Sequence, residues 1–328
     1  VDLRNKIQGN SAYFSNMETI MQENEDYKQF KKALRERDLS ALKKIAKGDL
    51  HNHAALGGSP KKKGIFPPDK FDGYKGMKQY INTAFYPEMS FLEGYKRYVE
   101  ATCQQAIEDG VIYLETSIDY RFLRMFKDIY SAFEYLDSLK NKYKNSCKIN
   151  YDLGLSRGSF RDFSMAKEII SDSVFSGIDL YGDESNQLLK DFADLFIFSR
   201  NRGKICKAHI GEFCSASEIF DTVNILSLHE VQHGVHIIDS DDIIKMMVDK
   251  DVAFNVCVTS NIKTGGFKDY KNHPVRKMFD DGLLITINSD DVLLFCSGVS
   301  DEFLHLYNSK VFNENELDII RKNGLRRC

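Results

Sequence analysis

The chain has 328 residues, of which 42% are hydrophobic and 28% are charged, so it can bury a large core. The formal net charge of −3 gives no electrostatic footprint for nucleic acid or an anionic membrane, and no run approaches the roughly 18 apolar residues of a membrane span. The opening segment VDLRNKIQGN shows no signal-peptide pattern, and the seven cysteines are scattered, with no C-x-x-C pair. We therefore expect a soluble, cytoplasmic protein without a disulfide framework.

The first part of the chain predicts helices and then a loop. Residues 1–47 are polar and charged, with apolar residues at helical spacing, which indicates a helical extension. Residues 59–76 are rich in proline and glycine and contain the run Lys61–Lys63, which is typical of a loop.

From residue 48 onward, runs rich in β-branched and aromatic residues alternate with helical stretches. The expected strands are 48–56, 110–118, 148–156, 175–182, 204–211, 233–239, 252–259 and 283–290. The expected helices between them are 91–109, 128–144, 162–171, 184–201, 215–229, 240–250 and 273–281.

This alternation implies parallel strands joined by right-handed crossovers. Eight such units close into a (β/α)8 TIM barrel, an α/β fold that would occupy residues 48–328 after the extension at 1–47. An open doubly wound sheet is the alternative. It is disfavoured because the segment LGGSP after the first strand is not a glycine-rich phosphate turn.

Side chains that can bind a metal occur at the expected strand ends, where the active sites of barrel enzymes lie. In LHNH, His51 and His53 are two residues apart, so on a strand they point to the same face, into an interior otherwise filled by aliphatic residues. A metal is the natural partner of two such imidazoles. A hydrogen-bonded pair of core histidines stays an open alternative.

Two further segments bring carboxylates to this end of the barrel. In KAHIGE, His209 ends the fifth expected strand, and Glu212 follows at the mouth, where a carboxylate could serve a metal-bound water. The alternative is a surface glutamate near a helix start. In NSDD, Asp290 and Asp291 end an apolar strand, an expensive position unless a cation or ligand engages them. The alternative interpretation is that one of these aspartates caps the N-terminus of the next helix.

The segment QHGVHIID contributes one more candidate. His233 lies beside Gly234, which allows close backbone approach, so we expect it in the site, and we expect His236 to be structural. Asp241 and Asp242 are expected to cap the next helix. The other histidines are expected to be ordinary surface or packing residues: His229, His273 and His305.

Together these segments resemble the adenosine deaminase family of metal-dependent amidohydrolases. The resemblance is carried by KGDLHNHAALGG, GVIYLETSIDYRF, GIDLYGDE, KAHIGE, QHGVHI, CVTSNIKTGG and HPVRKMFDDGLLITINSDDVLLF. They occur in the family's order and span residues 47–295, and HIGE and SDD are specific at this order and spacing. The sequence lacks the His-x-Glu and Pro-Cys-x-x-Cys pattern of the other deaminase fold.

The resemblance implies a hydrolase that uses one zinc ion per chain. The implied ligands are His51, His53, His209 and Asp290. Nickel, cobalt or iron could also occupy a site of three histidines and one carboxylate.

The resemblance also implies roles for the residues around the metal. Glu212 would protonate the ring nitrogen next to the reacting carbon, and His233 would orient and help activate the attacking water. Asp291 would hydrogen-bond the five-membered ring of the base, and Gly182 would contact the base through its backbone. Asp290 is also expected among the catalytic residues, and His53 among those that contact substrate.

The sequence departs from the family's pattern after the paired histidines. Adenosine-specific members commonly continue Leu-Asp-Gly, with the Asp on the ribose 5′-hydroxyl, whereas Ala54-Ala55-Leu56-Gly57 follows here. The missing carboxylate and the nearby Lys61–Lys63 would favour a phosphate. A solvated loop is the alternative interpretation of the lysines. Val292 also replaces the usual Pro after the paired Asp.

The implied activity is hydrolytic deamination of a 6-aminopurine nucleoside, adenosine to inosine and ammonia by default. AMP, an N6-substituted AMP or another 5′-modified adenosine is the first alternative, and a non-catalytic purine-binding protein is an alternative of another class. A hydrolase with a lysine-bridged metal pair ranks low, because FSGIDLYG contains no lysine. The expected partner is a small purine nucleoside or nucleotide, with neither nucleic acid nor a membrane, and the oligomeric state stays open.

Overall fold

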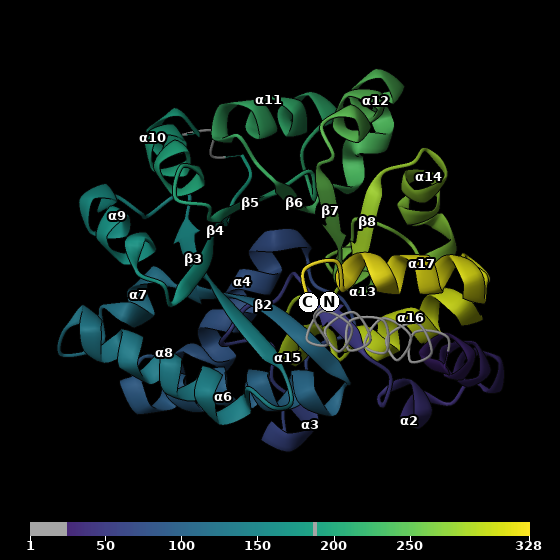
Figure 1. Cartoon of the computed structure of the whole chain (residues 1–328), viewed down its shortest axis with the longest axis horizontal. Coiled ribbons are helices and arrows are strands. Elements are labelled where there is room, and N and C mark those ends of the chain that lie inside the picture. Colours follow the sequence, from purple (N-terminus) through teal and green to yellow (C-terminus); the bar gives the residue numbers. More distant parts are fainter. Residues whose placement is uncertain (1–24, 186–188) are drawn as a thin grey trace, which may run out of the picture.

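The computed structural model describes residues 25–185 and 189–328, and Figure 1 shows a ring of strands surrounded by helices. The first part of the predicted extension, residues 1–24, lies outside the described residues. The described part is a helix over 25–36 followed by α2 (Leu39–Leu42). The buried ring of Phe30 packs edge-on against Phe303 at 5.5 Å, so the extension covers α16 (Val299–Asn308).

Eight parallel strands form a nearly closed barrel, in which each strand pairs with the next along the chain. The strands are β1 (Lys47–Asp49), β2 (Val111–Asp119), β3 (Lys148–Ser156), β4 (Phe175–Tyr181), β5 (Ile205–Ile210), β6 (Glu230–His233), β7 (Ala253–Val256) and β8 (Leu284–Ile287). Past β8, Asp290 bridges to Asn52, and its N–H donates to the His51 carbonyl at 2.9 Å, which joins the end of the barrel to its beginning. The predicted (β/α)8 barrel is confirmed.

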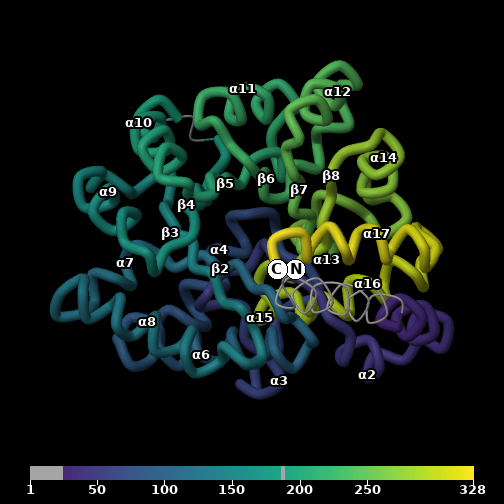
Figure 2. The backbone as a smooth tube through the Cα atoms, viewed as in Figure 1, coloured from purple at the N-terminus to yellow at the C-terminus, as the bar shows by residue number. Residues whose placement is uncertain are grey.

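Helices cover the outside of the ring, and the alternation of inner strand and outer helix can be followed along the tube in Figure 2. The longer helices are α4 (Gly73–Ala84), α6 (Leu92–Glu108), α8 (Ile129–Tyr143), α9 (Phe163–Ser171), α10 (Leu189–Arg200), α11 (Ala216–Leu226), α12 (Asp241–Asp249) and α17 (Glu314–Gly324). The shorter elements are α3 (Pro60–Lys63), α5 (Tyr86–Met89), α7 (Tyr120–Leu123), η1 (Val235–Asp239), α13 (Val258–Lys263), η2 (Tyr270–Asn272), α14 (Val275–Asp280) and α15 (Val292–Phe295). None of the helices in the described part of the chain combines the length and apolar character that crossing a bilayer requires.

The sixth strand was predicted over 233–239, but in the structure it ends at residue 233. β6 stops at His233, and Gly234 follows with a left-handed φ of 65°. A Cβ at residue 234 would lie 2.4 Å from the Phe254 ring, so glycine is required there. The turn takes the chain out of the sheet before the apolar run 235–239, which forms the 3₁₀ helix η1 instead of the predicted strand.

Two other boundaries differ from the prediction. β1 ends at Asp49, so most of the predicted strand 48–56 runs past the sheet and keeps isolated bridges from Asn52 and His53. The predicted loop 59–76 contains α3 and the start of α4. A proline in the first helical position and the left-handed Gly64 after the last one make α3 possible.

The residue that caps α12 lies one position before the predicted capping pair. Ser240 is the capping residue, and its hydroxyl accepts the Ile243 N–H at 3.4 Å. Asp241 and Asp242 lie in the first turn instead, where their negative charge faces the positive end of the helix dipole. The predicted capping role of these two aspartates is therefore wrong.

The barrel interior is polar, which corrects the expectation that aliphatic residues fill it. Lys207 of β5 is fully buried, and its ammonium contacts the carboxylates of Glu115, Asp152 (2.8 Å) and Glu230 (3.7 Å). It also donates a hydrogen bond to the Leu50 carbonyl at 3.2 Å. A buried ammonium is tolerated when carboxylates compensate its charge, and these residues therefore form one buried ion network.

The last residues of the chain complete this network. Arg326 and Arg327 each lie 2.6 Å from Glu230, and Arg327 lies 3.4 Å from Glu115. Glu230 is the first residue of β6, so the arginines lie at the amino ends of the strands. In Figure 1 the C-terminus lies over the middle of the ring, in agreement with these contacts.

Replacing Lys207 with Met should lower the free energy of unfolding by about 3–5 kcal/mol, because buried carboxylates lose their cation. Chemical denaturation followed by circular dichroism measures this change. Lys245→Met on α12 is the matched control, since the Lys245 side chain is 74% exposed. An unchanged unfolding midpoint for Lys207→Met would contradict the compensating role of Lys207.

Candidate active site and metal centre

Four histidines and an aspartate converge at the carboxyl ends of the strands. His51 and His53 follow β1, His209 lies near the end of β5, His233 ends β6, and Asp290 follows β8. The ring centroids of His51 and His209 are 4.7 Å apart, those of His51 and His233 are 4.5 Å apart, and those of His53 and His209 are 5.0 Å apart. The structure therefore brings together all four residues that the resemblance implies as ligands.

The imidazole of His51 is oriented by the backbone. Its Nδ1 donates to the Asn255 carbonyl at 3.0 Å, which leaves a lone pair on Nε2. This buried Nε2 has no hydrogen-bond partner among the described residues. Burial, and then the neighbouring histidines, lower the pKa of His51 well below its ordinary value, so the ring is neutral. A neutral imidazole with an unengaged lone pair is the form that binds a metal.

Asp290 brings a carboxylate to the same point. Its Oδ1 lies 3.7 Å from Nε2 of His51 and 3.6 Å from Nε2 of His53. The backbone of Asp290 has a φ of 56°, which is uncommon for a residue other than glycine and is typical of constrained functional positions. Three imidazoles and one carboxylate fit zinc or another divalent transition metal.

The potential ligand atoms fall into three overlapping groups in the described part of the chain. These groups are His51, His53 and His209; His51, His233, Cys257 and Asp290; and His53, Asp290 and Asp291. No single group contains all four implied ligands. Burial, and then the Asp290 charge, raise the pKa of the Cys257 thiol well above its ordinary value. Because metals bind the thiolate, Cys257 is a weaker candidate than the histidines. All seven cysteines are free in the structure.

A carboxylate that the sequence analysis did not single out holds His209. The Nε2 of His209 lies 3.3 Å from Oδ2 of Asp179, which also accepts the Ser117 hydroxyl at 2.6 Å. Burial alone would raise the pKa of Asp179, but His209 and then His53 lower it below its ordinary value. Asp179 therefore stays ionised and orients the His209 ring. The signal in the sequence was a carboxylate within the apolar strand FSGIDLYG.

Glu212 lies beside these histidines and is buried, so the alternative of a surface glutamate is wrong. Its Oε2 is 3.6 Å from Nε2 of His233, and its Oε1 accepts the Thr264 hydroxyl at 3.3 Å. Burial, followed by the charges of Glu184 and Asp290, raises the pKa of Glu212 well above its ordinary value. This shift favours the protonated form of Glu212, the form that a general acid requires.

Two charged residues that the sequence analysis missed hold the loop that carries Glu212. The buried carboxylate of Glu184 accepts the backbone N–H groups of residues 211–213, each at 3.1 Å. The buried guanidinium of Arg157 donates to the carbonyl of His209. Glu184 belongs to the motif LYGDE, but only the folded chain shows that its side chain turns toward the loop after β5.

The cluster opens into a cavity of about 510 Å³, a volume typical of small-molecule sites. The implied site residues that line it are His53, Gly182, His209, Glu212, His233, Asp290 and Asp291. Gly182 has a φ of 105°, which L side chains rarely adopt. Asp291 is the N-cap residue of α15, but its side chain makes no capping hydrogen bond, so capping does not account for its carboxylate.

Asp291 has the properties of a ligand-binding group. Its buried Oδ1 has no hydrogen-bond partner within the described residues. Burial, and then the charges of Asp290 and Glu212, raise the pKa of Asp291 well above its ordinary value. A buried carboxyl of this kind can donate or accept one hydrogen bond to a polar ligand at little further desolvation cost.

The lysine run lies away from this cavity. Lys61–Lys63 form α3 and are not among the residues that line the cavity. Lys62 pairs with Glu108, and the ammonium of Lys63 lies 4.0 Å from the centre of the Tyr98 ring. The expectation that this run contacts a phosphate is therefore not supported, and the solvated interpretation agrees better with the structure.

Comparison with known proteins agrees with this geometry. Residues 80–328 match the family model described as adenosine deaminase. The chain belongs to the adenosine deaminase family. Members of this family are metal-dependent aminohydrolases, and the chain is therefore an enzyme of that class. The match begins after His51 and His53, so these two residues lie outside it.

The individual proteins that this chain resembles are also described as deaminases. The chain is 27% identical over 278 residues to the putative adenosine/adenine deaminase of Treponema pallidum. The aligned region covers 82% of this chain and 93% of that protein. Its fold is similar to that of adenine deaminase from Arthrobacter aurescens, with a TM-score of 0.72 and 20% identity over 86% of this chain and 93% of that one. It is also similar to Arabidopsis N6-mAMP deaminase, with a TM-score of 0.72 and 14% identity over 86% of this chain and 92% of that one.

Asp290→Ala should weaken metal binding by at least about 10- to 100-fold, whereas Cys257→Ala should bind metal like the unchanged chain. The reason is that Asp290 places a carboxyl oxygen 3.7 Å from Nε2 of His51, whereas burial raises the pKa of the Cys257 thiol and so disfavours the thiolate that metals bind. Metal content per chain after dialysis against a weak chelator, measured by mass spectrometry, compares the two. Loss of metal from Cys257→Ala, with Asp290→Ala unaffected, would exclude the implied ligand set.

Proposed function

We propose that this chain catalyses the zinc-dependent hydrolytic deamination of a 6-aminopurine nucleoside, with adenosine converted to inosine and ammonia by default. The observation that carries the proposal is the position of buried Glu212, which lines the same cavity as His53, His209 and Asp290 of the implied ligand set and whose pKa burial raises well above its ordinary value. A proton donor beside a site for metal-activated water is the combination that replacement of a ring amino group by water requires.

The residues around the cavity each fit one part of this reaction. Glu212 would give its proton to the ring nitrogen next to the reacting carbon as the water oxygen bonds to that carbon. The proton that the water gives up would pass to the amino group, the carbon–nitrogen bond would then break, and ammonia would leave. The remaining proton of the former water would restore the proton on Glu212. His233 would orient the water, while Asp291 and the backbone at Gly182 would hold the base. Bound zinc would lower the pKa of a water molecule to about 7 and so supply the nucleophile at neutral pH.

The relatives support the purine ring as the substrate. The Treponema protein is described as a putative adenosine/adenine deaminase, and that description includes both nucleoside and free base. Free adenine therefore belongs beside adenosine in the first assay, followed by ultraviolet absorbance and ammonia release.

Glu212→Gln should lower kcat for adenosine by about 10²–10⁴-fold, because the amide keeps the size of the side chain but cannot transfer the proton. Steady-state kinetics and metal content of the zinc-loaded variant measure the effect, and metal content should stay unchanged. Glu168→Gln, an exposed position on α9, is the control and should keep full activity. Undiminished turnover by Glu212→Gln would mean that another group supplies the proton.

A second candidate substrate is a 5′-phosphorylated adenosine, and a specific group of cations favours it. Ala55 lines the cavity where the resemblance places a carboxylate in adenosine-specific members. Lys78 of α4 and Arg121 of α7 line the same cavity. The guanidinium of Arg121 is fixed by the Asp119 carboxylate through hydrogen bonds of 3.1 and 2.9 Å, and 70% of its side chain is exposed.

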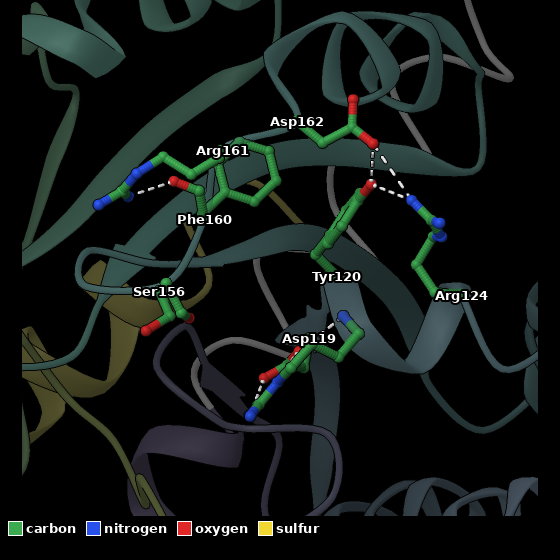
Figure 3. Close-up of a pocket in the computed structure, with 9 residues that line it drawn as sticks. Asp119, Tyr120, Arg124, Ser156, Phe160, Arg161 and Asp162 are labelled. Atoms are coloured by element: carbon green, nitrogen blue, oxygen red, sulfur yellow. Dashed lines mark hydrogen bonds and ion pairs between the residues drawn. The ribbon is translucent and has the colours of Figure 1, made fainter.

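A neighbouring cavity of about 440 Å³ extends this cationic wall. It shares Asp119, Arg121, Ser156 and Ser159 with the catalytic cavity. Figure 3 shows that Arg124 and Asp162 meet at Tyr120, whereas Arg161 points away from them. Arg161 donates to the backbone carbonyls of residues 158 and 160 and pairs with no carboxylate among the described residues. This charge favours an anionic group at the mouth of the cavity.

Arg121→Met should lower kcat/KM for AMP by about 10-fold or more and leave that for adenosine within about 2-fold, because the arginine would contact only the phosphate. Parallel kinetics with both substrates measure the ratio. Arg202→Met on the surface after α10 is the control and should change neither value. If the unchanged chain turns over adenosine but not AMP, the second candidate is wrong.

A further inference from the structure

A line of three buried side chains leads away from the catalytic cavity through His233. The next member is Asn261 of α13, and the last is His273, which follows η2. Only 2%, 1% and 3% of His233, Asn261 and His273 are exposed. We infer that His273 is a positioning residue: acting through Asn261, it fixes the tautomer of His233 so that its Nε2 presents a hydrogen to the cavity. The kinetic part of this inference rests on the proposed function.

The outer end of the line fixes the tautomer of His273. The backbone N–H of Val275 donates to Nδ1 of His273 at 3.1 Å. A backbone N–H can only donate, so Nδ1 carries a lone pair, and the hydrogen of the imidazole is on Nε2. Burial agrees with a neutral ring, since it lowers the pKa of His273 to about 3.

The hydrogen on Nε2 of His273 then fixes the orientation of the Asn261 amide. The Nε2 of His273 lies 3.2 Å from Oδ1 of Asn261 and donates to it. The amide NH₂ group therefore points the other way, toward the cavity, where Nδ2 lies 3.2 Å from Nδ1 of His233. Asn261 also hydrogen-bonds Glu212, and this contact opposes the rise that burial causes in the pKa of Glu212, as a donor to a carboxylate does. The amide orientation thus follows from its partners on both sides.

The Asn261 amide in turn fixes the tautomer of His233. Because Asn261 donates to Nδ1, that nitrogen carries a lone pair, and the hydrogen of His233 is on Nε2. This Nε2–H lies 3.6 Å from Oε2 of Glu212 and 3.9 Å from Oδ2 of Asp290. In this tautomer His233 donates a hydrogen bond into the cavity and cannot accept a proton there. The proton of the attacking water would then pass to the carboxylate of Asp290, and His233 would hold the water oxygen.

His273 was expected to be an ordinary packing residue, and its surroundings make that alternative testable. Its ring packs against Phe267, with the ring centroids 4.9 Å apart. If packing were its whole role, a phenylalanine at 273 would replace it well. If its Nε2–H fixes Asn261, a glutamine would replace it better, because its amide nitrogen can reach a similar position and donate to Oδ1.

The test compares zinc-loaded His273→Gln and His273→Phe with the unchanged enzyme. We expect His273→Gln to keep kcat within about 3-fold and His273→Phe to lower it by about 10- to 100-fold, with KM and metal content unchanged in both. Equal activity of the two variants, or better activity of His273→Phe, would overturn the inference.

A second measurement does not depend on turnover. Nitrogen-15 chemical shifts of His233 in the zinc-loaded enzyme should show that Nδ1 is unprotonated and that Nε2 is protonated. In Asn261→Asp the carboxylate can only accept, so the hydrogen should move to Nδ1. A protonated Nδ1 in the unchanged enzyme would refute the inference, even if no 6-aminopurine were a substrate. The expected shifts without deamination would leave the tautomer established and reject the proposed function alone.

Discussion

Burial of ionisable side chains at one end of the barrel is the constraint on which the rest of the site depends. A charge that leaves water must be compensated or neutralised, and here burial is the largest influence on the pKa values of His51, His53, His233, Glu212 and Asp291. It favours the neutral form of the imidazoles and the protonated form of the two carboxyls. The same desolvation thus produces lone pairs that can bind a metal and a proton that can be given to a ring nitrogen.

Neutral rings are useful only when they point in the right direction, and groups outside the cavity decide this. The Asn255 carbonyl orients His51, Asp179 orients His209, and Asn261 orients His233. In each case one ring nitrogen is engaged by the protein. Rigid partners of this kind reduce the reorganisation that a reaction would otherwise require.

The sequence was sufficient for the barrel and for finding the histidines and carboxylates that the structure brings together, because both leave local signals. The alternation of strand-like and helical segments predicted eight parallel strands, and histidines or carboxylates at strand ends predicted where the cavity lies. The sixth strand was misplaced because an apolar run after Gly234 resembles a strand, while the steric requirement at that glycine comes from Phe254, a residue on another strand. Local patterns cannot contain such a contact.

The supporting residues were out of reach for the same reason. Glu184, Arg157 and His273 act on partners that are distant in the sequence or depend on the direction of one side-chain atom, so composition and spacing say nothing about them. The polar interior was also missed, since Lys207 and its carboxylates look like isolated charges until the strands are in register.

The arginines at the carboxyl end of the chain have a consequence for how the barrel responds to its surroundings. Their side chains are 23% and 24% exposed, whereas Lys207, in the same network, is fully buried. Dissolved salt screens charges that water can reach far more than charges enclosed by protein. Rising ionic strength would therefore detach the outer layer of the network first and free the chain terminus, while the inner ammonium still holds the strands together. Release of the chain terminus from the amino ends of the strands would then be a step separable from global melting and remote from the catalytic end.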